Sequence, residues 1–255
     1  MKYTGTESNV TIPDKIDNKV VKTLGAESFT ENETVVGVTI PAQVTNLQYG
    51  AFASCTNLKK VTFAQGSQLK KIKEETFEHC QKLEEIHIPD SVTQIEKGAF
   101  YYCRSLSKLT LGKKLEVIDN NAFEGCSSLK QIEIPDSVES IGEGAFTYCT
   151  SLEPVTIGNK LAYVAKSAFS WCNLTEITWG DGIAKIGDSA FACNQKLTTV
   201  SIPDTVTELE YKAFAGCVEL SDIEIPDSVE AIGGYAFEKW DIYLSLIHIS
   251  EPTRL

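Results

Sequence analysis

Cysteine is the residue type in this chain with the widest chemistry, because its thiolate binds metals and its sulfur forms disulfides. The chain has eight cysteines, but it lacks the clustered CxxC pairs that zinc sites require. Seven cysteines lie three residues after a recurring phenylalanine: Cys55, Cys80, Cys103, Cys126, Cys149, Cys172 and Cys217. Asn32 and Asn194 occupy the same offset, whereas Cys193 is displaced by one residue.

A position that accepts either Cys or Asn is expected to be a small, buried and weakly polar slot. Both side chains can donate a hydrogen bond there to a backbone carbonyl at a bend. Side chains in consecutive units would point in the same direction, which disfavours disulfides. We therefore predict that the seven in-register thiols are reduced, buried and free of metal.

Histidine is the other residue type suited to acid–base chemistry. His87 lies two residues after Glu85 on the expected outward side of a strand, and a His–Glu pair can transfer protons. No serine or cysteine nucleophile motif accompanies this pair, and the sequence has no glycine-rich phosphate loop. A solvated strand residue is the simpler interpretation of His87. We therefore predict no catalytic residue, no cofactor and no metal site.

Composition limits the classes of partner. The formal net charge of -12 and the sequence pI near 4.8 argue against nucleic acids and anionic membranes, which would repel the chain. An acidic surface also keeps a long array soluble, and this explanation needs no partner. The sequence has no apolar run of the roughly 18 residues that a membrane span requires. The first ten residues, MKYTGTESNV, lack the apolar segment of a signal peptide.

A repeat determines the elements that position these side chains. Phenylalanines recur at intervals of 22 to 25 residues: Phe29, Phe52, Phe77, Phe100, Phe123, Phe146, Phe169, Phe191, Phe214 and Phe237. A fixed period in this range is typical of a solenoid, in which each unit buries its apolar face only by stacking on the next.

One unit, residues 129–149, reads LKQIEIPDSVESIGEGAFTYC. Ile132 and Ile134 are two residues apart, so they share one face of a short strand. The following Pro-Asp pair is typical of a tight turn. Val138 and Ile141 predict a second short extended piece, and Phe146 is expected to fill the core from a helical turn. Stacked units would align the first strands into a parallel sheet with neighbours about 4.8 Å apart.

The pattern LxxIxIPxxVxxIxxxAFxxC resembles the BspA-like, or treponemal-type, leucine-rich repeat over roughly residues 10–240. This resemblance implies a leucine-rich-repeat solenoid with repeats of about 23 residues. Its parallel β-sheet would lie on the concave face, with a second short strand and a helical turn in each unit. The resemblance also implies a secreted or cell-surface bacterial protein that binds proteins of a host or a neighbouring cell.

The last residues differ from the repeat. LSLIHISEPTRL, residues 244–255, resembles the conceptual translation of a sequencing adapter attached to a truncated metagenomic reading frame. We therefore expect one array over residues 1–243, with about ten units and a partial first one, and a non-native tail over residues 244–255. Leu244, Ile247 and Ile249 nevertheless reproduce the spacing of a first strand, so this tail is expected to mimic a further unit.

Two surfaces are candidates for binding. One is the outward side of the first strands, and the other is the row of residues that immediately precede the cysteines. For the first surface, a competing explanation is that alternating charges pair across neighbouring strands. For the second surface, it is that the side chains are partly buried against the next unit. The candidate partner-binding residues are Glu85, His87, Lys108, Glu133, Glu176, Thr178, Asp222 and Glu224 on the strands, and Tyr102, Tyr148 and Trp171 in the row.

These observations favour a non-enzymatic module for protein binding or adhesion. Its partner would be an unidentified protein or glycan, for example on the surface of a host or neighbouring cell, and not a nucleic acid. No insertion of this chain into a membrane is expected. The alternative is a structural spacer that displays other domains and has no ligand of its own. A binding module should group unusual surface residues in space, whereas a spacer should scatter them.

Overall fold

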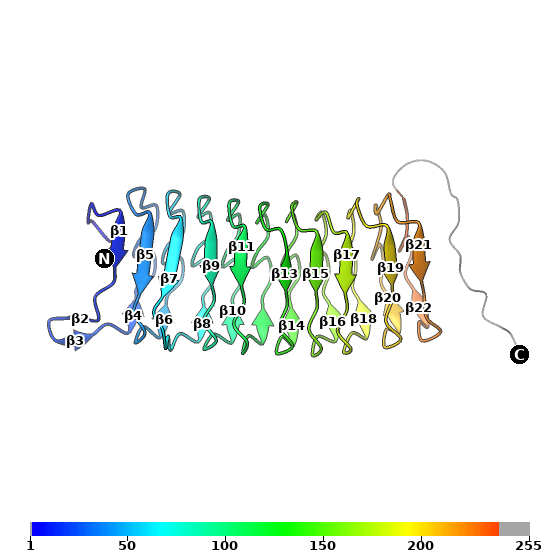
Figure 1. Ribbon diagram of the computed structural model, residues 1–255, viewed down its shortest axis with the longest axis horizontal. Coiled ribbons are helices and arrows are strands. Elements are labelled where there is room, and N and C mark those ends of the chain that lie inside the picture. Colours follow the sequence, from blue (N-terminus) through cyan, green and yellow to red (C-terminus); the bar gives the residue numbers. More distant parts are fainter. Residues whose placement is uncertain (1, 240–255) are drawn as a thin grey trace, which may run out of the picture.

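The computed structural model describes residues 2–239 as an elongated row of stacked units (Figure 1). Most units contribute two short strands. The first strands are β1 (Asn9–Thr11), β5 (Gly37–Ile40), β7 (Lys60–Phe63), β9 (Glu85–His87), β11 (Lys108–Thr110), β13 (Ile132–Glu133), β15 (Pro154–Thr156), β17 (Glu176–Thr178), β19 (Thr199–Ser201) and β21 (Asp222–Glu224). They pair in parallel, in the register that the repeat predicts, and form sheets of five, three and two strands.

The second strands form one continuous parallel sheet of ten. They are β4 (Thr23–Leu24), β6 (Asn46–Leu47), β8 (Lys71–Ile72), β10 (Gln94–Ile95), β12 (Val117–Ile118), β14 (Ser140–Ile141), β16 (Tyr163–Val164), β18 (Lys185–Ile186), β20 (Glu208–Leu209) and β22 (Ala231–Ile232). An antiparallel hairpin of β2 (Lys15–Ile16) and β3 (Lys19–Val20) lies near the N-terminal end of the row (Figure 1). The parallel solenoid inferred from the repeat is therefore confirmed.

The prediction of a helical turn in each unit is wrong, since the described residues form turns but no helix. The unit of Phe123 shows the physical reason. Asn121 has a φ of 55° and Gly125 a φ of 73°, and this left-handed backbone cannot continue a right-handed helix. The Phe123 amide donates to Ala145 O in the next unit at 2.8 Å, whereas Cys126 N donates locally to Phe123 O at 3.2 Å. The backbone thus bonds alternately within and between units.

The repeat phenylalanines form one column through the core. Neighbouring rings are stacked with centroids 4.9–5.7 Å apart. Nine of them, from Phe29 to Phe214, are buried. Phe237 is the exception, because it is half-buried. Within the described residues its ring stacks on Phe214 alone, so one of its faces lacks a phenylalanine neighbour.

The cysteines form a second column beside the rings. All eight are buried and none is in a disulfide. Each in-register thiol donates to the carbonyl of a repeat phenylalanine in a neighbouring unit, with Sγ–O distances of 3.0–3.4 Å. Asn194 replaces this contact with a hydrogen bond from Nδ2 to Phe169 O at 2.9 Å. The predicted buried slot is therefore confirmed for the seven in-register cysteines and Asn194, whereas Asn32 is half-buried and accepts a hydrogen bond from Val35 N at 2.9 Å.

The predicted strand mimicry of Leu244, Ile247 and Ile249 lies outside the described residues, as does the rest of the expected tail.

Candidate functional site

The outward residues of the first strands form two columns in the expected register. Glu85 is paired with Lys60 and Lys108 in one column, and His87 with Thr110 in the other. Further along, the pairs are Pro154–Glu176 and Thr156–Thr178 in one sheet, and Thr199–Asp222 and Ser201–Glu224 in another, with Glu133 opposite Thr156. The structure therefore arranges the candidate residues of the strands in a line along the array, in separate sheets, and does not gather them into one site.

Several charges on these strands already have partners. Lys60 Nζ lies 2.7 Å from Glu85 Oε1, and this contact lowers the pKa of the Glu85 carboxyl. Ser201 donates to Glu224 Oε2 at 2.9 Å. Both contacts join adjacent strands, so they support the alternative that cross-strand pairing accounts for the polar residues here. Glu85 and His87 share the outward face of β9, and the carboxylate of Glu85 is paired with Lys60.

The row before the cysteines has an unusual backbone. Its members all have a positive φ of 54–73°: Ser54, His79, Tyr102, Gly125, Tyr148, Trp171, Cys193 and Gly216. Glycine adopts this conformation at no steric cost, whereas bulky side chains are rare there. Tyr148 and Trp171 are nevertheless 43% and 40% exposed, so burial in the next unit does not account for them. Their rings are stacked with centroids 6.0 Å apart.

A second aromatic group lies on the other side of Gly125. The Tyr102 ring is 4.6 Å from the Tyr101 ring and 5.7 Å from the His79 ring, measured between centroids. Glu78 and Glu124 flank this group, and both are half-buried. We call these five residues the aromatic–acidic patch.

Sequence reasoning identified Tyr102 but missed Tyr101, Glu78 and Glu124 as site residues. All three directly follow a repeat phenylalanine. Other units place a small residue at this position, such as Ala53 or Ser170. A large or charged residue directly after the repeat phenylalanine was therefore the sequence signal that could have identified them.

The carboxyl groups of the patch and the Tyr101 hydroxyl have raised pKa values. Burial raises the pKa of the Glu124 carboxyl. Burial is also the largest cause of the raised pKa of Glu78, with the neighbouring Glu75 charge adding to it. Burial raises the pKa of the Tyr101 hydroxyl as well, and the charges of Glu124 and Glu78 raise it further. The patch therefore presents acidic groups whose charges are only partly compensated.

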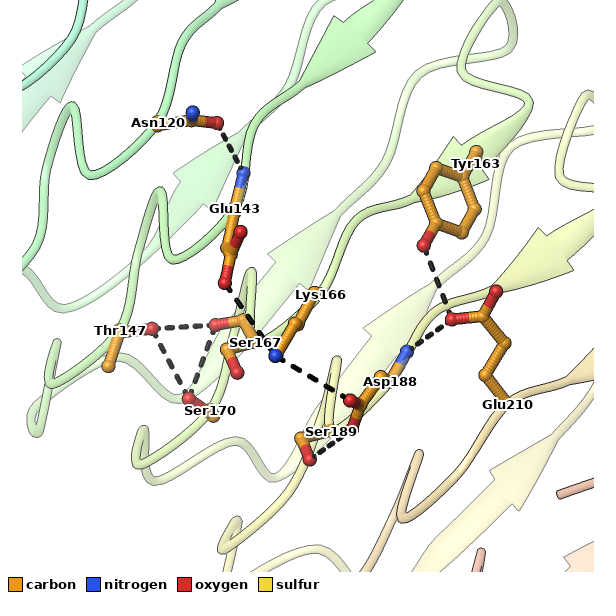
Figure 2. A network of polar contacts seen from close by, with 10 residues as sticks. All are labelled: Asn120, Glu143, Thr147, Tyr163, Lys166, Ser167, Ser170, Asp188, Ser189 and Glu210. Atoms are coloured by element: carbon orange, nitrogen blue, oxygen red, sulfur yellow. Dashed lines mark hydrogen bonds and ion pairs between the residues drawn. The ribbon is translucent and has the colours of Figure 1, made fainter.

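Another polar cluster lies just after β14, β16, β18 and β20 in the ten-stranded sheet, and its groups pair with one another (Figure 2). Lys166 Nζ lies 3.9 Å from Glu143 Oε1 and 3.8 Å from Asp188 Oδ2. Glu210 Oε2 accepts hydrogen bonds from Asp188 N at 2.7 Å and from the Tyr163 hydroxyl at 3.3 Å (Figure 2). Because these groups satisfy one another across stacked units, the cluster has a structural explanation.

A hollow of about 190 Å³ lies on the first-strand face near its N-terminal end. It opens beside Gly37, which has no side chain between the paired positions Asn9 and Lys60. Its two lysines, Lys59 and Lys60, are paired with Glu84 and Glu85, and its other polar residues are Asn9 and three threonines. Elsewhere in residues 2–239, no group of three or more His, Cys, Asp or Glu side chains is arranged to hold a metal. The same residues contain no helix able to cross a membrane.

Comparisons with known proteins agree on the architecture. The family profile described as BspA type leucine rich repeat region matches residues 3–130 and 116–243. No curated protein matches the chain.

Solved bacterial structures are similar to the chain. A leucine-rich repeat protein from Eubacterium ventriosum is 25% identical, with a TM-score of 0.67 over 96% of this chain and 68% of that one. The Treponema pallidum leucine rich repeat protein is 27% identical, with a TM-score of 0.57 over 77% of this chain and 80% of that one. The pneumococcal vaccine antigen PcpA, 22% identical with a TM-score of 0.55 over 91% of this chain and 77% of that one, shares the fold.

Proposed function

The chain belongs to the BspA-type leucine-rich repeat family, and on this premise we propose that it is a non-enzymatic protein-binding module of a bacterial surface or secreted protein. One observation carries the proposal. Exposed aromatic residues occupy left-handed backbone positions where glycine serves equally well in other units. Tyrosine and tryptophan are enriched in protein interfaces.

The alternative of a structural spacer is less well supported. A spacer needs only the stacked core, and Gly125 and Gly216 show that a unit can stack without an aromatic residue in the row. Aromatic residues in the left-handed region cost stability there. Their grouping at His79, Tyr102, Tyr148 and Trp171, with small residues before and after, matches the spatial clustering expected of a binding surface. The extracellular or surface location is supported by the family resemblance.

The proposal is tested with the full chain and a panel of purified extracellular host proteins. Binding of at least one of them, weakened by Tyr148→Gly and by Trp171→Gly, is expected. The matched control is Tyr211→Ser, because Tyr211 is 44% exposed but lies outside the row. If no panel protein binds, or if the control weakens binding as much as the row variants, the binding role of the row is refuted and the spacer is favoured.

A further inference from the structure

The aromatic–acidic patch carries a more specific inference about the partner. Its rings are held at a cost in stability, since Tyr102 has a φ of 55° and His79 a φ of 54°. The same position in the next unit is Gly125. A Cβ on Gly125 would lie only 2.9 Å from the Tyr102 ring, so Tyr102 packs directly on the glycine backbone. Gly125 thus leaves the room that the Tyr102 ring occupies.

The acidic members of the patch have no lysine or arginine partner, in contrast to several other glutamates of the described residues. Glutamates such as Glu85, Glu139 and Glu208 lie 2.7–3.1 Å from a lysine nitrogen. Within the described residues, neither Glu78 nor Glu124 forms an ion pair with Lys or Arg. The Glu78 Oε1 atom lies 3.8 Å from His79 Nε2. A half-buried carboxylate without a cation is an unfavourable arrangement that a cationic ligand would relieve.

The aromatic members of the patch already accept one cation. The guanidinium carbon of Arg104 lies 5.3 Å from the centroid of the Tyr102 ring. This contact shows that the ring can stack with a guanidinium group. Arginine is also the side chain that combines stacking on an aromatic face with paired hydrogen bonds to a carboxylate. The patch offers both kinds of group side by side.

We propose that the aromatic–acidic patch of Glu78, His79, Tyr101, Tyr102 and Glu124 binds an arginine-bearing basic segment of the partner protein. This inference rests on the proposed binding function and specifies the chemistry of its partner. An arginine of the segment takes the place of Arg104 on the Tyr102 ring and pairs with Glu124, while the formal net charge of -12 attracts the rest of the segment. A neutral glycan would use the rings but would leave both carboxylates without a cation.

The test uses the full chain and three short synthetic peptides, in which glycine alternates with arginine, lysine or glutamine. Fluorescence anisotropy is measured at low and at physiological salt. The arginine peptide is expected to bind most tightly, and its affinity should fall as salt screens the attraction. Equal binding of the glutamine peptide, or no binding of the arginine peptide, would overturn the proposal.

Variants test whether the arginine peptide binds at the patch. Tyr102→Gly is expected to weaken binding of the arginine peptide by about 3- to 30-fold, the range of a cation–π contact. Glu124→Gln is expected to weaken it by about 10- to 150-fold, the range of a hydrogen bond to a charged group. Glu219→Gln removes the same charge at an exposed site outside the patch and should leave the affinity unchanged. A control that weakens binding as much as Glu124→Gln would refute the patch. Thermal melting of each variant shows that it is folded.

The two proposals can fail separately. If a panel protein binds the chain but Glu124→Gln and Tyr102→Gly have no effect on it, the patch is refuted and the binding function stands. If neither a panel protein nor the arginine peptide binds, both proposals are refuted.

Discussion

Replacing Phe123 by alanine tests the physical basis of the array. Phe123 is fully buried and lies between Phe100 and Phe146, with ring centroids at 5.0 and 5.2 Å. Its removal opens a cavity that rigid neighbouring units cannot easily fill. We expect a loss of about 3–5 kcal/mol in the free energy of unfolding, the usual cost of a buried Phe→Ala change. Two lost ring contacts of about 0.5–1.5 kcal/mol each are part of this cost.

Phe237→Ala is the matched control, because Phe237 is half-buried and stacks on only one phenylalanine within the described residues. Its loss should be below about 3 kcal/mol, since little cavity remains. Urea unfolding followed by circular dichroism measures both values. Each unit contacts only its neighbours, so Phe123→Ala should also broaden the transition or divide it in two. A cost for Phe123→Ala equal to or below that of Phe237→Ala would refute the stacked core.

The remaining predictions concern the buried thiols, Glu124 and the last twelve residues. Burial raises the pKa of the thiols, that of Cys172 to about 12, so thiol reagents at pH 8 should modify few cysteines in the native chain and all eight after denaturation. Since unfolded thiols ionise from about pH 9.0, stability should fall as the pH rises above this value, and a pH-independent stability between about pH 8 and 11 would contradict the buried column. Burial also raises the pKa of Glu124, so ionisation of its carboxyl favours the unfolded state. Glu124→Gln should therefore raise the melting temperature at pH 7, measured by differential scanning calorimetry. This gain should disappear below pH 4.5, the ordinary pKa of a glutamate carboxyl. Deleting residues 244–255 should leave binding unchanged, and a binding activity that disappears with this segment would show that it belongs to the functional protein.

The sequence alone determined the parallel solenoid and its register. The period of the phenylalanines and the alternation at Ile132 and Ile134 each specify which side chains face the core, and the structure pairs Ile132 with Val155 as the repeat requires. The cysteine slot could also be predicted, because Cys and Asn share a small volume and a donor. These properties depend on spacing, which a linear sequence records directly.

The path of the backbone after the second strand could not be predicted in this way. The sequence near Phe123 has Ala122 and Glu124, which favour a helix, but also Asn121 and Gly125, which favour turns. The structure holds Asn121 and Gly125 in the left-handed region, where hydrogen bonds alternate within and between units.

The candidate site was only partly predictable for the same reason. Tyr102, Tyr148 and Trp171 could be found as aromatic residues in a variable position, but their strained backbone is visible only in the structure. The patch depends on Glu78 and Glu124, which are 46 residues apart in sequence and lie on either side of Tyr101. The sequence specifies which residue occupies each unit. Only stacking decides which side chains of different units share a surface, which charges lack a partner there, and how far burial raises their pKa.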